Sequence, residues 1–81
     1  MPTILLTDPF REDFDKLTGI EQKQARKALR MLAQDPRYPS LQIHKIRGTA
    51  FWEAYVNMDI RIIFENTGDT LIVHAIGHQT F

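Results

Sequence analysis

Side chains suited to proton transfer and phosphate binding gather in and beside the most strand-like part of the chain. The segment "AFWEAYVNMDIRIIFE", residues 50–65, holds Glu53, Tyr55 and Arg61, and His44 precedes it. Histidine exchanges a proton near neutral pH, and arginine holds phosphate or carboxylate with a permanently charged planar fork. Because successive side chains of a strand point to opposite faces, these four are expected to project from one face of a sheet.

The other two histidines are expected on the same face if the last strand alternates regularly. With Val73 and Ala75 directed toward the core, His74 and His78 project to the opposite side. All three histidines of the chain would then share a surface with Arg61. This expectation depends on the register between strands, since a slip of one residue moves every side chain to the other face.

Each of these residues also has an ordinary structural explanation. Arg61 and Glu53 can form a cross-strand ion pair, which contributes from a few tenths to about 1 kcal/mol. His44 can be a polar residue on a strand surface, and His74 can fill the sheet. Turn chemistry alone accounts for Asp59. An ion pair and a catalytic role are compatible at Arg61, so both interpretations stay open.

The elements that must position these residues begin with a strand and a helix. The strand is expected at "TILLT", residues 3–7. Asp8 is expected to cap the helix, with Pro9 at its first position and Gly19 at its end. One apolar stripe at helical spacing is expected to face the core. It consists of Phe10, Phe14 and Leu17.

A second helix follows at once. Thr18 and Glu21 have the spacing of a capping box, and the helix is expected to stop at Asp35 because Pro36 follows it. The buried face of this helix is expected to consist of Ile20, Ala25, Ala28, Leu29 and Leu32. The short connection between the two helices predicts a helical hairpin.

The rest of the chain reads as strands. Patterns typical of strands occur at "LQIHKI", "FWEAYVN", "DIRIIFE" and "TLIVHAIGH", and the last is apolar on both faces, as a central strand is. The predicted fold is α+β in the order β-α-α-β-β-β, within one domain spanning residues 1–81. A small twisted, antiparallel-rich sheet carries the helical hairpin on one face and leaves the other face partly open.

The amino-acid composition limits the kinds of function and site that the chain can have. The chain has 81 residues, ten basic and ten acidic side chains, and no cysteine. The zero formal net charge does not indicate a nucleic-acid binder, so any such role depends on a local patch. The absence of cysteine excludes disulfides and thiolate metal sites and fits a reducing cytoplasm. No apolar run is long enough to cross a bilayer, and the histidine spacing gives no metal-site pattern.

The pattern "YPSLQIHKIRG…FWEAYVNMDIRIIFE…DTLIVHAIGH" resembles the RelE/ParE superfamily of bacterial toxin–antitoxin toxins, over nearly the whole chain. The RelE, YoeB and YafQ branches of that superfamily are ribosome-dependent mRNA endonucleases, and the ParE branch poisons DNA gyrase. The resemblance implies a type II toxin with a RelE-like fold that cleaves mRNA and is neutralised by a cognate antitoxin. A gyrase inhibitor and an inactive domain that only binds its antitoxin are the alternatives.

The resemblance also implies roles for single residues. Arg61 matches the arginine that holds the scissile phosphate in RelE and YoeB. His44 matches a functional histidine of YafQ and a glutamate general base of YoeB. Asp59 matches an aspartate of the YafQ site, and "GHQTF" places His78 and Phe81 like a histidine and a phenylalanine of YafQ. The paired lysines of RelE and a late arginine of RelE and YafQ have no counterpart, which favours the inactive alternative.

The chemistry implied by this resemblance is attack of a 2′-hydroxyl on the adjacent phosphate, which needs a base, an acid and positive charge but no metal or other cofactor. His44 is the expected general base, His78 the general acid and Arg61 the phosphate ligand. Further substrate contacts are expected from Glu53, Tyr55, Asp59 and Phe81, with the aromatic rings stacking a displaced base.

The second helix adds a basic stripe, formed by Lys23, Arg26, Lys27 and Arg30. Their spacing of i, i+3, i+4 and i+7 places them on one face of the helix. A solvated helix face is the commoner explanation of such a stripe. The functional interpretation is contact with phosphates of ribosomal RNA, which would give a neutral protein a local surface for nucleic acid.

Overall fold

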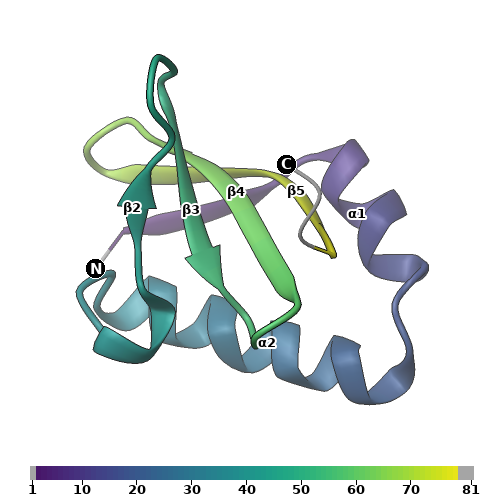
Figure 1. Cartoon of the computed structure of the whole chain (residues 1–81). Coiled ribbons are helices and arrows are strands. Elements are labelled where there is room, and N and C mark those ends of the chain that lie inside the picture. Colours follow the sequence, from purple (N-terminus) through teal and green to yellow (C-terminus); the bar gives the residue numbers. More distant parts are fainter. Residues whose placement is uncertain (1, 79–81) are drawn as a thin grey trace.

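The protein is described by a computed structural model, which covers residues 2–78. It forms a twisted five-stranded sheet with two helices packed on one face (Figure 1). The elements in chain order are β1 (Thr3–Leu6), α1 (Asp8–Asp15), α2 (Gly19–Gln34), the 3₁₀ turn η1 (Pro39–Leu41), β2 (His44–Lys45), β3 (Phe51–Tyr55), β4 (Ile60–Asn66) and β5 (Thr70–His78). The α+β class is confirmed. Four strands follow the helices, so the expected order contained one strand too few.

The strands lie in the order β1-β5-β4-β3-β2. β1 runs parallel to β5, and the other neighbouring pairs are antiparallel. The sheet is therefore mixed and antiparallel-rich, as expected. β5 lies between β1 and β4, which explains its apolar character on both faces, because a central strand has neighbours on both edges.

The core lies between the helices and one face of the sheet. Phe10 of α1 and Leu32 of α2 are buried there. The strands contribute Ala54, Ile60, Ile62, Phe64, Leu71, Val73 and Ile76 to the same cluster. We call this side of the sheet the helix face and the opposite side the open face.

Ile20 was expected in the core but is 75% exposed. It lies five residues before the buried Ala25, which is about 140° around a helix with 3.6 residues per turn. The buried stripe of α2 therefore continues back toward Glu21 and Gln22, which are half-buried, and leaves Ile20 on the solvent side.

Side chains cap both helices. The cap of α1 is Thr7 and not Asp8, which is the first residue of the helix. Thr7 Oγ1 accepts a hydrogen bond from the Phe10 backbone at 3.4 Å and donates one to the Val73 carbonyl of β5 at 2.9 Å. This second hydrogen bond favours Thr7 over Asp8 as the capping residue, because it connects the start of the helix to β5.

The capping box predicted for α2 is confirmed. Glu21 N–H donates to Thr18 Oγ1 at 3.2 Å, and Thr18 N–H donates to Glu21 Oε1 at 2.9 Å. The helix ends at Gln34, and Asp35 has extended backbone angles, as expected for a residue before proline.

The strand predicted at residues 41–46 is much shorter in the structure. Leu41 belongs to η1, and Gln42 has a φ of 44°, in the left-handed region that interrupts an extended chain. Only His44 and Lys45 pair with β3, where His44 lies opposite Glu53.

We predict that Thr18→Ala lowers the free energy of unfolding by about 1 kcal/mol, because the Glu21 N–H loses its acceptor at the start of α2. Urea unfolding measures this loss. The matched control is Ile20→Ala in the same helical turn, where the exposed side chain should contribute less than about 0.5 kcal/mol. Equal losses in both variants would contradict a capping role.

Candidate active site

One extra residue in β5 determines which histidines share a face of the sheet. Ile63 of β4 lies opposite Ala75, and the next residue, Phe64, lies opposite Val73. His74 between them has no partner in β4, so the strand forms a bulge. Ala75 was expected to face the core, but the bulge places it opposite Ile63 on the open face.

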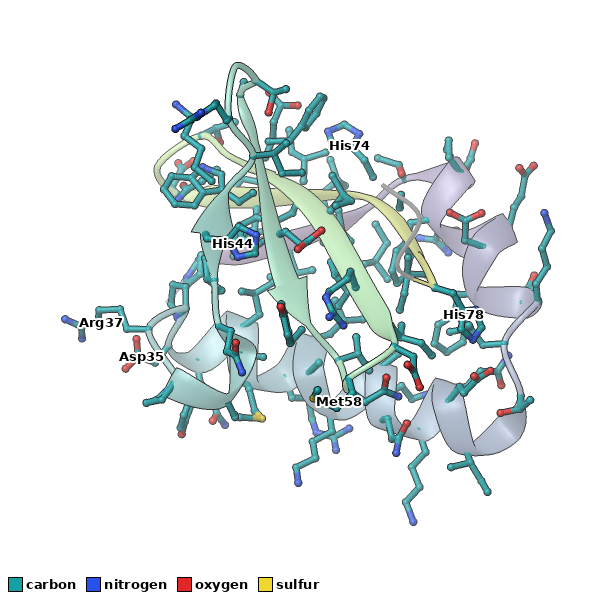
Figure 2. All side chains as sticks on the ribbon, in the orientation of Figure 1. Asp35, Arg37, His44, Met58, His74 and His78 are labelled. Atoms are coloured by element: carbon teal, nitrogen blue, oxygen red, sulfur yellow. The ribbon has the colours of Figure 1, made fainter. Side chains whose placement is uncertain are left out.

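The bulge reverses the alternation of β5 beyond His74. Val73 and Ile76 both lie in the core, although they are three residues apart. His78 lies opposite the buried Ile60, so it projects from the helix face. Its Nε2 is 3.4 Å from Glu21 Oε2 at the start of α2 (Figure 2). The expectation that His78 shares a face with Arg61 is therefore wrong.

The ion pair at this end of β5 affects the carboxyl group of Glu21. The backbone N–H of Thr18, and to a smaller extent His78, hold the pKa of Glu21 below its ordinary value. A carboxyl with a lowered folded-state pKa stabilises the fold above its unfolded pKa, and that contribution is lost as the pH falls through the folded value. His78 thus joins β5 to the cap of α2.

On the open face, three adjacent strands bring together His44, Glu53, Tyr55 and Arg61, which we call the Arg61 cluster. Glu53 is at its centre. Its Oε1 is 3.1 Å from His44 Nε2 and 3.9 Å from Arg61 Nε. The Glu53 side chain is 14% exposed and that of His44 is 53% exposed, so the cluster reaches solvent at the histidine. The predicted gathering of these four residues is confirmed.

Arg61 is the most enclosed member of the cluster, with 2% of its surface exposed. Its guanidinium carbon lies 3.5 Å from the centre of the Tyr55 ring, which is a cation–π contact. Nη1 donates to the Asn57 carbonyl at 2.7 Å and to the Ile60 carbonyl at 3.3 Å. Arg61 therefore also holds the turn that joins β3 to β4.

Both ring nitrogens of His44 face oxygen acceptors. Nδ1 is 3.0 Å from the Gln42 carbonyl and Nε2 is 3.1 Å from Glu53 Oε1. A neutral imidazole has one N–H, so both hydrogen bonds form at once only when the His44–Glu53 pair carries one further proton, on the ring or on the carboxyl group. The Tyr55 ring stands at the edge of the imidazole, with centroids 6.4 Å apart. The imidazole of His44 and the carboxyl group of Glu53 are therefore placed to exchange a proton.

The other predicted site residues are distributed elsewhere. Asp59 is exposed in the β3–β4 turn, where its N–H donates to Asn57 Oδ1 at 2.8 Å. Ordinary turn chemistry accounts for that contact. Phe81 lies outside the described residues. All four residues of the basic stripe are exposed, and Arg26 also stacks on Phe14, with its guanidinium carbon 5.2 Å from the ring centre.

The sequence analysis did not identify Asn57 as part of the site. Its carbonyl accepts from Arg61, and its Nδ2 donates to Gln24 Oε1 of α2 at 2.8 Å. Asn57 therefore connects the Arg61 cluster to the helix. The signal in the sequence was the turn "VNMD", in which an asparagine is common for backbone reasons alone.

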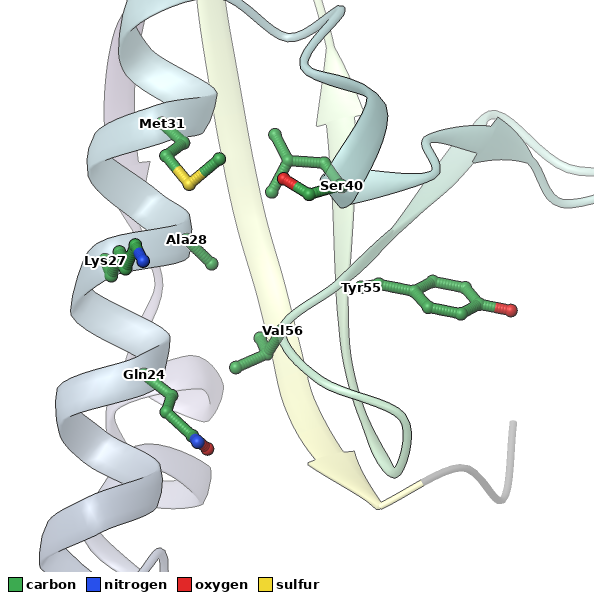
Figure 3. A pocket seen from close by; sticks show the side chains of 8 residues that line it. Gln24, Lys27, Ala28, Met31, Ser40, Tyr55 and Val56 are labelled. Carbon is green, nitrogen blue, oxygen red and sulfur yellow. The ribbon is translucent and has the colours of Figure 1, made fainter.

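The structure also has a groove of about 260 Å³ between α2 and the end of β3. Figure 3 shows Gln24, Ala28 and Met31 on the helix side and Val56 across from them. The Tyr55 ring points away from this groove and toward the Arg61 cluster. The groove and the cluster are thus separate features on opposite sides of β3.

Two further searches of the described residues were negative. Between residues 2 and 78, no three or more histidine, aspartate or glutamate side chains are arranged to hold a metal ion. Within that same stretch, no helix has the length and apolar character needed to span a membrane.

Comparison with known proteins gives matches at the level of structure. No family model and no curated protein matches the sequence. A copper-bound mutant toxin from Helicobacter pylori aligns with a TM-score of 0.81 and 26% identity, over 99% of this chain and 97% of that one.

Two more distant structures show the same fold. RelE in the RelB–RelE antitoxin–toxin complex from Methanococcus jannaschii has a TM-score of 0.77 and 22% identity, over 93% of this chain and 90% of that one. YafQ from E. coli has a TM-score of 0.76 and 18% identity, over 98% of this chain and 94% of that one. The structural neighbours are toxins, and some were solved together with their antitoxins.

Proposed function

We propose that the chain, which has the fold of the RelE/ParE toxins, is the toxin of a type II toxin–antitoxin system that cleaves mRNA on the ribosome. Its partners would be a cognate antitoxin, the ribosome and mRNA, which places it in the cytoplasm. The observation that carries the proposal is the Arg61 cluster, which joins an imidazole, a carboxyl group and a guanidinium on the open face.

The cluster has the groups needed for attack of a 2′-hydroxyl on the adjacent phosphate. The Glu53 carboxylate accepts the proton of the attacking hydroxyl. His44 lies at the solvent-exposed side of the cluster, with both ring nitrogens facing oxygen atoms, and it donates a proton to the leaving 5′-oxygen. Arg61 neutralises the charge that develops on the phosphate. The bond from phosphorus to O2′ forms as the bond to O5′ breaks.

These roles differ from those that the sequence alone suggested. His44 was expected to be the base and His78 the acid, but the two rings project from opposite faces of the sheet. Glu53 replaces His44 as the proton acceptor, because its carboxylate lies between the imidazole and the guanidinium. His44 takes the acid role in place of His78.

The enclosure of Arg61 sets a condition on this mechanism. A phosphate reaches a guanidinium that is 2% exposed only when a covering group moves. Tyr55 covers one side of it, and outward rotation of this ring would expose the guanidinium and offer the ring to a displaced base. The same enclosure favours the second candidate function, a RelE-fold domain that binds its antitoxin without cleaving RNA.

Expression of the chain without an antitoxin, followed by mapping of mRNA ends, separates the candidate functions. New ends inside translated codons are expected for the ribosome-dependent nuclease. Double-strand DNA breaks with intact mRNA would indicate a ParE-like gyrase inhibitor. Normal growth at a high level of folded protein would indicate the inactive, antitoxin-binding domain.

We predict that Arg61→Ala abolishes toxicity and mRNA cleavage, because the guanidinium that would neutralise the phosphate is lost. Arg61→Lys should restore cleavage only in part, since lysine keeps the charge but loses the two-pronged fork. Growth and mRNA ends are measured at matched protein levels. Co-purification with the antitoxin controls for folding, which is needed because Arg61 also holds the β3–β4 turn. Parental toxicity in Arg61→Ala would exclude this role.

The proton roles predict opposite responses to a substrate whose leaving 5′-oxygen is replaced by sulfur, since sulfur departs without a proton. On normal mRNA, His44→Ala and Glu53→Gln should each cut at least about 10²-fold more slowly. On the sulfur substrate, His44→Ala should recover most of its rate and Glu53→Gln should not. Single-turnover cleavage of ribosome-bound mRNA with one modified linkage measures both.

His78→Ala is the matched control for that experiment, because His78 lies on the helix face and should cleave both substrates at the parental rate. A slow His78→Ala that sulfur rescues would restore His78 as the acid. A slow His44→Ala that sulfur does not rescue would restore His44 as the base.

We predict that glutamine substitution of the whole basic stripe weakens association with ribosomes and reduces its salt dependence. Each lost phosphate contact should lower the slope of log affinity against log salt by about 0.7 to 0.9. Co-sedimentation across a salt series measures the slope. The matched control removes four other exposed basic residues, Arg11, Lys16, Arg37 and Lys45. Equal slopes for the two variants would mean that the stripe makes no special contact.

A further inference from the structure

A second group of side chains lies on the open face beside the Arg61 cluster and has no part in the proposed cleavage. Phe51 of β3 lies opposite Glu65 of β4. His74 Nε2 is 2.8 Å from Glu65 Oε1, and the His74 ring meets the Phe51 ring edge-on, with centroids 5.3 Å apart and an angle of 80°. We call these three residues the Phe51 group.

The Phe51 group is open to solvent. Phe51 is 36% exposed, and the side chains of His74 and Glu65 are 35% and 36% exposed. Phe51 lies outside the core cluster and packs against the His74 ring by its edge contact, so part of its ring stays open to a further partner. The carboxylate is acceptor-only when ionised, and the hydrogen bond from His74 fixes its orientation. The group therefore presents an aromatic surface next to a fixed hydrogen-bond acceptor.

The strand register sets how far the group lies from the Arg61 cluster. Phe51 is two residues from Glu53 and four from Tyr55 on the same face of β3, or about 7 and 13 Å along the strand. Ile63, opposite Glu53, is the β4 residue between Glu65 and Arg61. Ile63, which is 8% exposed, thus separates the two groups along β4.

We propose that the Phe51 group is a nucleobase site, which holds a base of the RNA strand whose scissile phosphate lies at the Arg61 cluster. This site rests on the proposed function and determines which sequences are cut. The base stacks on Phe51, as unpaired bases stack on exposed aromatic side chains. Glu65 accepts hydrogen bonds from the edge of the base.

The chemistry of Glu65 selects among the bases. Guanine presents an N–H and an amino group side by side, so it can give a carboxylate two parallel hydrogen bonds. Uracil presents one N–H between two carbonyl oxygens, which a carboxylate repels. The Phe51 group is therefore a guanine-preferring site, and the bond from His74 keeps the carboxylate in place for that contact.

Binding of short oligoribonucleotides to the purified protein tests this site apart from cleavage. All probes carry 2′-O-methyl groups, which block attack of the 2′-oxygen on the phosphate. The affinity of a dinucleotide is compared with that of the same dinucleotide extended by guanosine or uridine at either end. Extension by guanosine at one end should tighten binding at least about fivefold in the parent. Phe51→Ala should lose that gain and Phe51→Trp should keep it. Glu65→Gln should remove the difference in affinity between the probe extended by guanosine and the probe extended by uridine.

Leu5→Ala is the matched control, because Leu5 is an apolar side chain on the open face with 53% exposure, in β1, and Ile72 of β5 separates it from Glu65. The increase in affinity on extension by guanosine should be the same in Leu5→Ala as in the parent. An equal gain in Phe51→Ala, or no binding of any probe to the parent, overturns the nucleobase site. Loss of the nucleobase site would leave the proposed cleavage intact if the parent still cuts mRNA in cells. Absence of new mRNA ends in cells would contradict the proposed cleavage itself.

Discussion

The bulge at His74 is the constraint on which the surface chemistry of this sheet depends. One residue without a partner in β4 reverses the alternation of β5, so Val73 and Ile76 both reach the core. The same reversal keeps His74 beside Glu65 on the open face and turns His78 toward α2. A regular strand would have buried Ala75 and left Ile76 exposed, so packing of the larger side chain favours the bulge.

Glu53 is the electrostatic centre of the open face. A half-buried carboxylate between an imidazole and a guanidinium is stabilised by both, and removing either partner leaves charge that solvent only partly screens. Arg61 donates a hydrogen bond to the backbone carbonyl of Asn57, and the Asn57 side chain donates one to Gln24 of α2. The site is thereby linked to α2 through one turn, so its geometry depends on how the helix packs.

The sequence predicted those features that local patterns determine. The capping box at Thr18 and the shared face of Glu53, Tyr55 and Arg61 follow from fixed spacings, and both are confirmed. The features that were missed depend on long-range contacts. Thr7 caps α1 because its hydroxyl also donates to β5, and the bulge depends on packing between β5, β4 and the helices.

Left-handed backbone was the other source of error. Gln42 adopts a conformation that is uncommon outside glycine and asparagine, so no residue type indicated that the strand at 41–46 would be interrupted there. The consequence reaches the site, because this backbone places the carbonyl of Gln42 3.0 Å from His44 Nδ1, where it favours a proton on that nitrogen. A local backbone feature without a sequence signal therefore affects where a histidine of the candidate site carries its proton.

Charge is divided between two surfaces of a chain with no net charge. The basic stripe lies on α2, whereas the Arg61 cluster sets one carboxylate against its guanidinium and the Phe51 group adds a second carboxylate. Long-range attraction to RNA therefore comes from the helix, and the open face contributes only short-range contacts. On the proposed function, the basic stripe would draw the protein to ribosomal RNA, and the short-range contacts of the open face would hold the message in place for cleavage.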